Sequence, residues 1–271
     1  MLQLVQSGVL LIGTLAGAIT DAKSGYIYDW ITVPMILLGT LISIFFGQWN
    51  NLLVGAAVFA ALYISYWLGK IGGGDVKIFT AIALLNPFNN YGFFFGAAFF
   101  AAASSIVFYS VYYTLKYSKK GVNFEENKEG IVQAVLFGIF LAAYFVAAIK
   151  FGLFGKTAVF ILGFPLFCGL IFFALQKGIR KNFFRKKVSL KNLEEDEIIS
   201  TEGNSEKILK IFMIKGAIKK GVIGKKEIAK LKKMKIKSIY VLRGLPPFGP
   251  FIFVGVAIAL LAPDFFMLLF S

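Results

Sequence analysis

The stretch KIGGGDVKIF, Lys70 to Phe79, places three consecutive glycines and an aspartate directly before an apolar run. Apolar runs recur along the chain, and several are long enough to cross the roughly 30 Å of hydrocarbon in a bilayer. Of the 271 residues, 58% are hydrophobic and only 16% are charged, which is typical of a membrane protein and excludes an ordinary soluble domain. The sequence therefore predicts an all-α, polytopic membrane helix bundle.

The apolar runs predict about eight membrane spans. They cover residues 4–20, 31–47, 51–69, 76–88, 91–115, 131–149, 157–176 and 249–268. The fourth is short and ends near Pro87, so we expect it to be tilted or only partly immersed. The first run has neither a preceding basic region nor a small-residue cleavage site, which indicates a retained helix and not a cleaved signal.

Lysines in the short connections predict the orientation, because basic residues accumulate on the cytoplasmic side of a membrane. With the N-terminus outside, the cytoplasmic connections hold Lys23, Lys70, Lys77, Lys116, Lys119, Lys120 and Lys128. The outer connections hold only Lys150 and Lys156. We therefore expect a multi-pass protein of the cell membrane with its N-terminus outside.

Residues 177–243 differ in composition from the rest of the chain. They contain 20 lysines and arginines against 7 acids, an excess of 13 out of the chain's formal net charge of +15. We interpret this region as a solvated cytoplasmic loop whose lysines retain the topology and contact anionic lipid headgroups. No base-stacking motif accompanies the basic patch, so nucleic acid is not an expected partner.

The chain has no histidine and a single cysteine, Cys168. These counts exclude a zinc site of the Cys/His type, a Ser-His-Asp triad and a Cys-His pair. We expect neither a metal nor a cofactor. Acid–base chemistry near neutral pH must then come from carboxylates, lysines or tyrosines.

Ten of the 14 acidic residues lie in the polar segments 121–130 and 177–243, and the other four are Asp21, Asp29, Asp75 and Asp264. Asp21 ends one apolar run and Asp75 begins another, so both are expected at the inner membrane boundary. A charged group at that depth is costly unless it is paired, hydrated or functional. A hydrated helix end at Asp21 and a helix N-cap at Asp75 are the simpler interpretations.

Two carboxyl groups that flank one water can hydrolyse a peptide bond. One of them, ionised, takes a proton from the water, and the other, protonated, donates to the carbonyl oxygen. The pair titrates as a unit, so the roles of Asp21 and Asp75 stay open. We expect Gly72, Gly73 and Gly74 to leave room for an extended substrate and to adopt unusual backbone angles, although a simple linker is the alternative.

At these positions the sequence resembles the type IV prepilin peptidases, which are intramembrane aspartyl proteases with a G-x-G-D motif. The segment GGGDVK, starting at Gly72, is similar to their second catalytic motif, and DAKSGYIYDW, starting at Asp21, is similar to their first. GLPPFGPFIF, Gly244 to Phe253, is similar to the Pro-Gly-Pro-Phe start of a late helix in that family. The resemblance implies catalytic Asp21 and Asp75, with substrate-binding or positioning roles for Gly72, Gly73, Gly74, Lys77, Ser24 and Asp29.

The resemblance also implies the reaction. Such an enzyme removes the short basic leader from type IV pilin-like or archaellin precursors at the cytoplasmic membrane face, in contact with membrane lipid. The zinc-binding cysteines of many bacterial members are absent, so the chain is similar to the short archaeal preflagellin peptidase type. The predicted domains are 1–176, a membrane protease core with spans one to seven; 177–243, a basic cytoplasmic region; and 244–271, the last span.

Two alternatives from other classes remain. Acids at helix ends also occur in ion- or proton-coupled transporters, although we find no internal inverted repeat. A non-catalytic pilus assembly platform is the other, because the basic region would dock a partner. The glutamates at 125, 126 and 129, or the acids Glu194 to Glu197, either attract a basic leader or balance nearby lysines.

Overall fold

The computed structural model describes residues 1–68, 70–194, 197–214, 217–218, 223–234 and 236–265. Helices dominate, and each predicted span coincides with one of them, although residues 266–268 of the last span lie outside the described residues. These helices are α1 (Leu2–Ser24), α2 (Asp29–Phe45), α3 (Trp49–Trp67), α4 (Gly73–Leu84), α5 (Tyr91–Ser118), α6 (Phe124–Lys150), α7 (Lys156–Ile179) and α10 (Gly249–Leu261).

Among the described residues, five helices are long and apolar enough to cross a membrane: α1, α3, α5, α6, and α7 together with the π-helical turn Arg180–Phe184 that continues it. The chain is therefore a multi-pass membrane protein. α2, α4 and α10 are shorter, with 17, 12 and 13 residues. At about 1.5 Å per residue, α4 extends for roughly 18 Å, which is less than the hydrocarbon thickness. The expectation that the fourth span is short agrees with this length.

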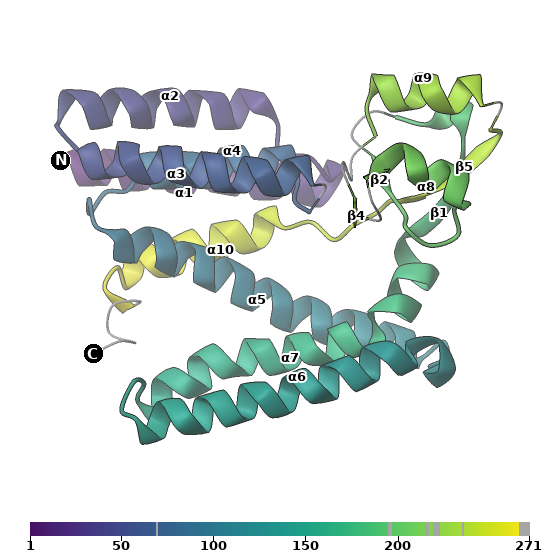
Figure 1. Ribbon diagram of the computed structural model, residues 1–271. Helices are drawn as coiled ribbons and strands as arrows, with labels where there is room; N and C mark the ends of the chain where they lie inside the picture. Colours follow the sequence, from purple (N-terminus) through teal and green to yellow (C-terminus); the bar gives the residue numbers. More distant parts are fainter. Residues whose placement is uncertain (69, 195–196, 215–216, 219–222, 235, 266–271) are drawn as a thin grey trace.

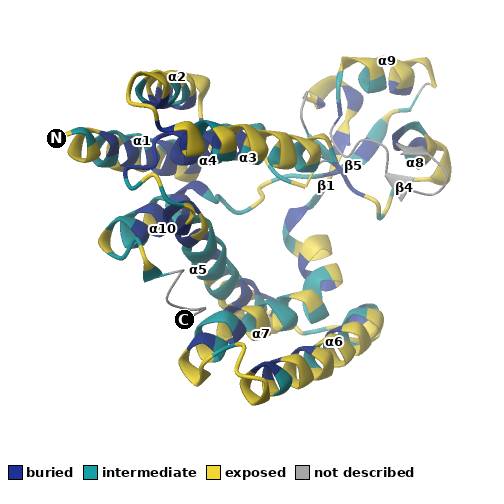
Figure 2. Ribbon diagram, turned by 60° about the vertical axis from the view of Figure 1, so that its left-hand side comes forward, coloured by how far each residue is buried: buried dark blue, intermediate teal, exposed yellow. Residues whose placement is uncertain are grey.

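The helices are arranged as a series of packed neighbours (Figure 1). α2 and α3 pack against α4, and α10 packs against both α1 and α5. α7 packs against both α5 and α6. Much of α6 is exposed (Figure 2). Its exposed residues include the large apolar Leu136, Ile139 and Phe140. An apolar surface of this extent indicates contact with lipid.

α4 lies at the centre of the main core. Its side chains from Val76 to Leu84 are buried except at Lys77, and they join a cluster with residues of α1, α2, α5 and α10. Gly39 of α2 and Gly55 of α3 let these helices approach α4. A Cβ atom added to Gly39 would lie 2.8 Å from Leu84, and one added to Gly55 would lie 2.6 Å from Leu84. This packing fixes α4 within the bundle, and Asp75 lies in the first turn of that helix.

Between α7 and α10 the chain forms a second folded part, the α/β unit, by which we mean the described residues from 185 to 242. It contains β1 (Arg185–Ser189), β2 (Ile198–Ile199), α8 (Glu206–Phe212), β3 (Met213–Ile214), β4 (Ala217–Ile218), α9 (Lys225–Lys233) and β5 (Ser238–Leu242). One antiparallel sheet has the order β1-β5-β2, with Arg185 opposite Leu242, and a second sheet pairs β3 with β4. The two ends of the unit therefore lie side by side.

The α/β unit has its own core. Phe212, Ile223, Leu231 and Val241 are almost completely buried in one cluster. The interpretation of residues 177–243 as a solvated loop is therefore wrong for this part of the chain. Lysines of α9 are exposed to solvent as expected, but the apolar residues between them pack inward.

Candidate active site

Asp21 and Asp75 lie on helices that meet close to both residues. α1 approaches α4 at Gly17, where an added Cβ atom would lie 3.0 Å from Cδ1 of Ile78. Asp21 follows Gly17 by one helical turn and Asp75 precedes Ile78 by one turn, so each aspartate is on the face turned toward the other helix. The carboxyl groups are close enough for the charge of Asp21 to act on Asp75. The structure thus brings the two aspartates together.

Ile27, in the connection between α1 and α2, packs against both helices of the pair. An added Cβ atom at Gly17 would lie 3.4 Å from Cγ2 of Ile27, and one at Gly74 would lie 2.9 Å from the Cβ atom and from the carbonyl oxygen of Ile27. Any side chain at position 74 would therefore push this connection away from the start of α4. The close approach gives Gly74 a steric role directly beside Asp75.

The expectation of unusual backbone angles in the glycine run is wrong. None of Gly72, Gly73 and Gly74 has a positive φ; Gly72 is extended and the other two form the first turn of α4. The helix begins earlier than predicted, at Gly73, so that Asp75 is its third residue. Oδ2 of Asp75 accepts the N–H of Gly72 at 3.2 Å. Such a bond satisfies a backbone donor that a helix start leaves free.

Asp21 is held by the first residues of α10. The side chain is buried, and its Oδ2 accepts the N–H of Gly249 at 2.6 Å, while the amide of Phe248 also interacts with the carboxylate. A Cβ atom at Gly249 would lie 2.9 Å from the Cβ atom of Asp21, so only glycine fits without a shift. Backbone N–H groups and the helix dipole at a helix start both favour a negative charge.

The other predicted site residues are near the pair but contact different groups. Nζ of Lys77 forms an ion pair with Oδ1 of Asp29, the first residue of α2, at 2.5 Å. The hydroxyl of Ser24 donates to the carbonyl oxygen of Thr20 at 2.7 Å and is exposed. Lys77 and Asp29 therefore tie the start of α2 to the start of α4, and Ser24 is occupied within α1.

Within the described residues, neither Asp21 nor Asp75 forms an ion pair with a lysine or arginine. Other acids are neutralised: Glu126 pairs with Lys181 at 3.0 Å, and Glu197 pairs with Arg243. For these two glutamates the structure favours the interpretation that they balance basic residues. Residues 195 and 196 of the acidic run lie outside the described residues.

Sequence reasoning missed two residues around Asp21. The segment containing Gly249 is noted only for its resemblance, and Tyr109 of α5 is not singled out at all. Tyr109 is close enough for the charge of Asp21 to act on its phenol, and its hydroxyl donates to the carbonyl oxygen of Pro247 at 2.5 Å. For Gly249 the available signal was a glycine directly after Pro-Pro-Phe at a helix start. No feature of the sequence pointed to Tyr109.

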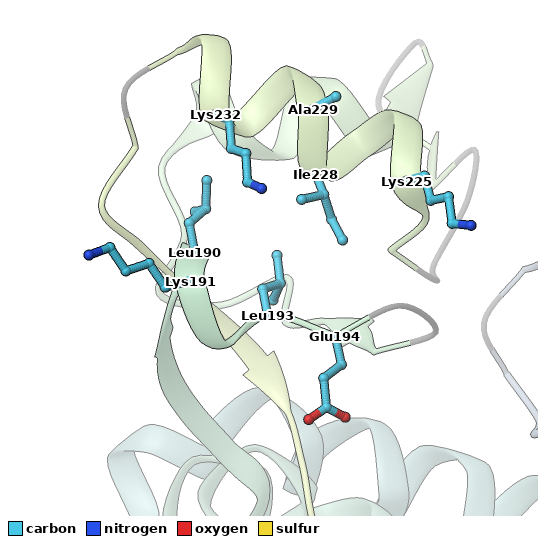
Figure 3. A pocket seen from close by; sticks show the side chains of 8 residues that line it. All are labelled: Leu190, Lys191, Leu193, Glu194, Lys225, Ile228, Ala229 and Lys232. Atoms are coloured by element: carbon cyan, nitrogen blue, oxygen red, sulfur yellow. The ribbon is translucent and has the colours of Figure 1, made fainter.

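A pocket of about 620 Å³ lies in the α/β unit, away from the aspartates (Figure 3). Leu190, Leu193 and Ile228 form its apolar part, and its rim carries Lys191, Lys225, Lys232 and Glu194. One carboxylate among several lysines is not a hydrolytic pair, so Asp21 and Asp75 remain the candidate site. No group of three His, Cys, Asp or Glu side chains in the described part of the chain is placed to hold a metal ion.

Comparison with known families adds an independent observation. The sequence model of the type IV leader peptidase family matches residues 8–108, which include both aspartates, α2 to α4, and most of α1 and α5. No curated protein and no solved structure gives a significant match. The α6–α7 pair and the α/β unit lie beyond the match. Residues 8–108, which include both aspartates, are thus the part of this chain that is similar to the type IV leader peptidase family.

Proposed function

We propose that this protein is a membrane aspartyl endopeptidase that removes the short basic leader from type IV pilin-like or archaellin precursors. The observation that carries the proposal is the approach of Asp21 and Asp75, each of which has one carboxyl oxygen bonded to a backbone N–H at a helix start. The match to the type IV leader peptidase family supports a peptidase of this substrate class.

The chemistry needs one water and no cofactor. The ionised member of the pair removes a proton from the water, whose oxygen attacks the carbonyl carbon of the scissile bond. The protonated member donates its proton to the carbonyl oxygen, which gives a tetrahedral diol. Collapse of the diol breaks the C–N bond. The carboxyl group that took the water proton donates it to the leaving nitrogen, and the other carboxylate takes a proton from a diol hydroxyl, which restores the pair. Donors already placed on both aspartates keep the carboxyl groups oriented throughout.

We place this site at the cytoplasmic membrane face, with the N-terminus of the chain outside. The lysine distribution of the connections supports this orientation. A precursor whose basic leader precedes an apolar helix would present its cleavage site at that depth. The division into 1–176, 177–243 and 244–271 is part of the proposal, and the separate core of the α/β unit supports the middle region.

The test is cleavage of a purified precursor by the full-length protein in detergent, followed by gel shift. Asp21→Asn and Asp75→Asn are each expected to lower the cleavage rate by at least about 100-fold, the usual scale for removing a general acid or base. The matched control is Asp264→Asn, which changes an exposed carboxylate beyond the end of α10 and should leave the rate unchanged.

Full cleavage by either site variant would remove that residue from the mechanism. A chelator should also have no effect, because the pair needs no metal. Cleavage that depended on added zinc or ATP would refute the proposed chemistry.

A further inference from the structure

The start of α10 is fixed at two points that lie close together in the chain. The N–H of Gly249 donates to Asp21 on α1, and the carbonyl oxygen of Pro247, two residues earlier, accepts the hydroxyl of Tyr109 on α5. One bond reaches the candidate catalytic carboxylate, and the other anchors the same backbone to a neighbouring helix. The same short stretch of backbone therefore carries both bonds.

The segment before α10 has few bonding groups of its own. Pro246 and Pro247 have no N–H, so they cannot donate to a neighbouring backbone. A carbonyl group in partly buried surroundings needs a partner. Among the described residues, the Tyr109 hydroxyl is the partner recorded for the Pro247 carbonyl. Without it, this connection would be held mainly by the packing of its rings.

The ring of Tyr109 contributes a separate contact. It lies against Phe251 in the first turn of α10, with ring centroids 5.1 Å apart, and against Tyr113 on its own helix at 5.9 Å. The ring thus supports the position of α10 as a whole, whereas the hydroxyl fixes the backbone directly before Gly249. A change to phenylalanine would separate these two contributions, because it keeps the ring and removes the bond.

We propose that Tyr109 is a positioning residue for Asp21: its hydroxyl holds Pro247 so that the N–H of Gly249 stays directed at the Asp21 carboxylate. The inference rests on the proposed peptidase function. Tyr109 acts on the reacting group through the start of α10. Removing its hydroxyl should therefore lower kcat and leave KM unchanged, provided that KM reports substrate binding.

The experiment measures kcat and KM for precursor cleavage by the full-length protein in detergent. Tyr109→Phe is expected to lower kcat by about 10- to 100-fold, the scale of a small misplacement of a reacting group, with KM within about twofold. The matched control is Tyr112→Phe, three residues along the same helix. Its exposed hydroxyl contacts Lys116, so both constants should be unchanged.

Thermal unfolding of each variant separates positioning from folding. Tyr109→Phe should unfold within a few degrees of the unchanged protein because the ring contacts remain. A second variant, Gly249→Ala, inserts a methyl group between α10 and Asp21, and it should also lower kcat. If Tyr109→Phe has an unchanged kcat, or loses activity only in proportion to lost folded protein, the inference is wrong.

Asp21→Asn in the same assay distinguishes this inference from the function on which it rests. Loss of cleavage in Asp21→Asn together with a normal kcat in Tyr109→Phe overturns only the role of Tyr109. Normal cleavage in Asp21→Asn overturns the proposed function itself.

Discussion

The membrane bundle and the α/β unit hold their carboxylates with different partners. In the bundle, Asp21 and Asp75 receive only backbone N–H groups among the described residues. In and beside the α/β unit, Glu197 is paired with Arg243, and Glu202 with Arg185 at 3.3 Å. In each of these pairs a fixed positive charge occupies the carboxylate through a charge-assisted hydrogen bond. Backbone donors orient the acids of the bundle without occupying them with a fixed positive charge.

The two regions also differ in how their cores are assembled. The bundle core joins residues from Leu10 to Ala259, whereas every member of the α/β core lies between Val188 and Val241. The bundle core is thus built from contacts between distant parts of the chain, and the core of the unit from a short interval. Two separate cores imply that damage to one region should leave the other folded.

The largest expected effect follows from damage to the core of the unit. Leu231 of α9 is completely buried, so Leu231→Ala should destabilise the α/β unit by about 2–5 kcal/mol through lost burial and a cavity. Limited proteolysis should then cut within the unit while the bundle stays intact. Lys232→Ala, at the next, exposed position, is the control and should behave as the unchanged protein. Joint unfolding of both regions would contradict the idea of separate cores.

A change beside the aspartates should instead impair cleavage and leave the α/β unit folded. Gly74→Ala would place a methyl group 2.9 Å from Ile27, so the connection after α1 must shift and the carboxyl groups lose their alignment. We expect the cleavage rate to fall by about 10- to 100-fold, while the α/β unit keeps its resistance to protease. Gly8→Ala in α1, with no neighbour within 4 Å of the new methyl group, should leave cleavage unchanged.

The smallest effect is expected at the ion pair between the starts of α2 and α4. The Asp29 side chain is 66% exposed, so Asp29→Asn should lower stability by no more than about 1 kcal/mol. Substantial cleavage should remain, measured at low and at high salt. A loss of cleavage as large as that of Asp75→Asn would instead make Asp29 part of the catalytic machinery.

The helical part of the fold could be predicted from the sequence because long apolar runs have few structural alternatives in a membrane. The boundaries were less predictable. α4 begins at Gly73 and not at residue 76, since the Asp75 side chain caps the helix from inside its first turn. The α/β unit was missed because its strands have two to five residues, too few for an alternating pattern among so many lysines.

Some residues of the candidate site could also be predicted from the sequence, and others could not. Asp21 and Asp75 could be predicted because a carboxylate beside an apolar run stands out in the sequence. The partner of Asp21 could not, since the donor is a backbone N–H, which every residue other than proline carries. Tyr109 was equally hidden: the chain has 11 tyrosines, and only the packing of α5 on α10 distinguishes this one.

The bond between Asp21 and Gly249 joins residues 228 positions apart. At the usual 5–20 residues per second of protein synthesis, the second residue emerges roughly 10–45 s after the first. Throughout that interval the nascent chain has both aspartates in place but no donor for Asp21. If the proposed function holds, cleavage activity should therefore appear only after α10 has joined the bundle.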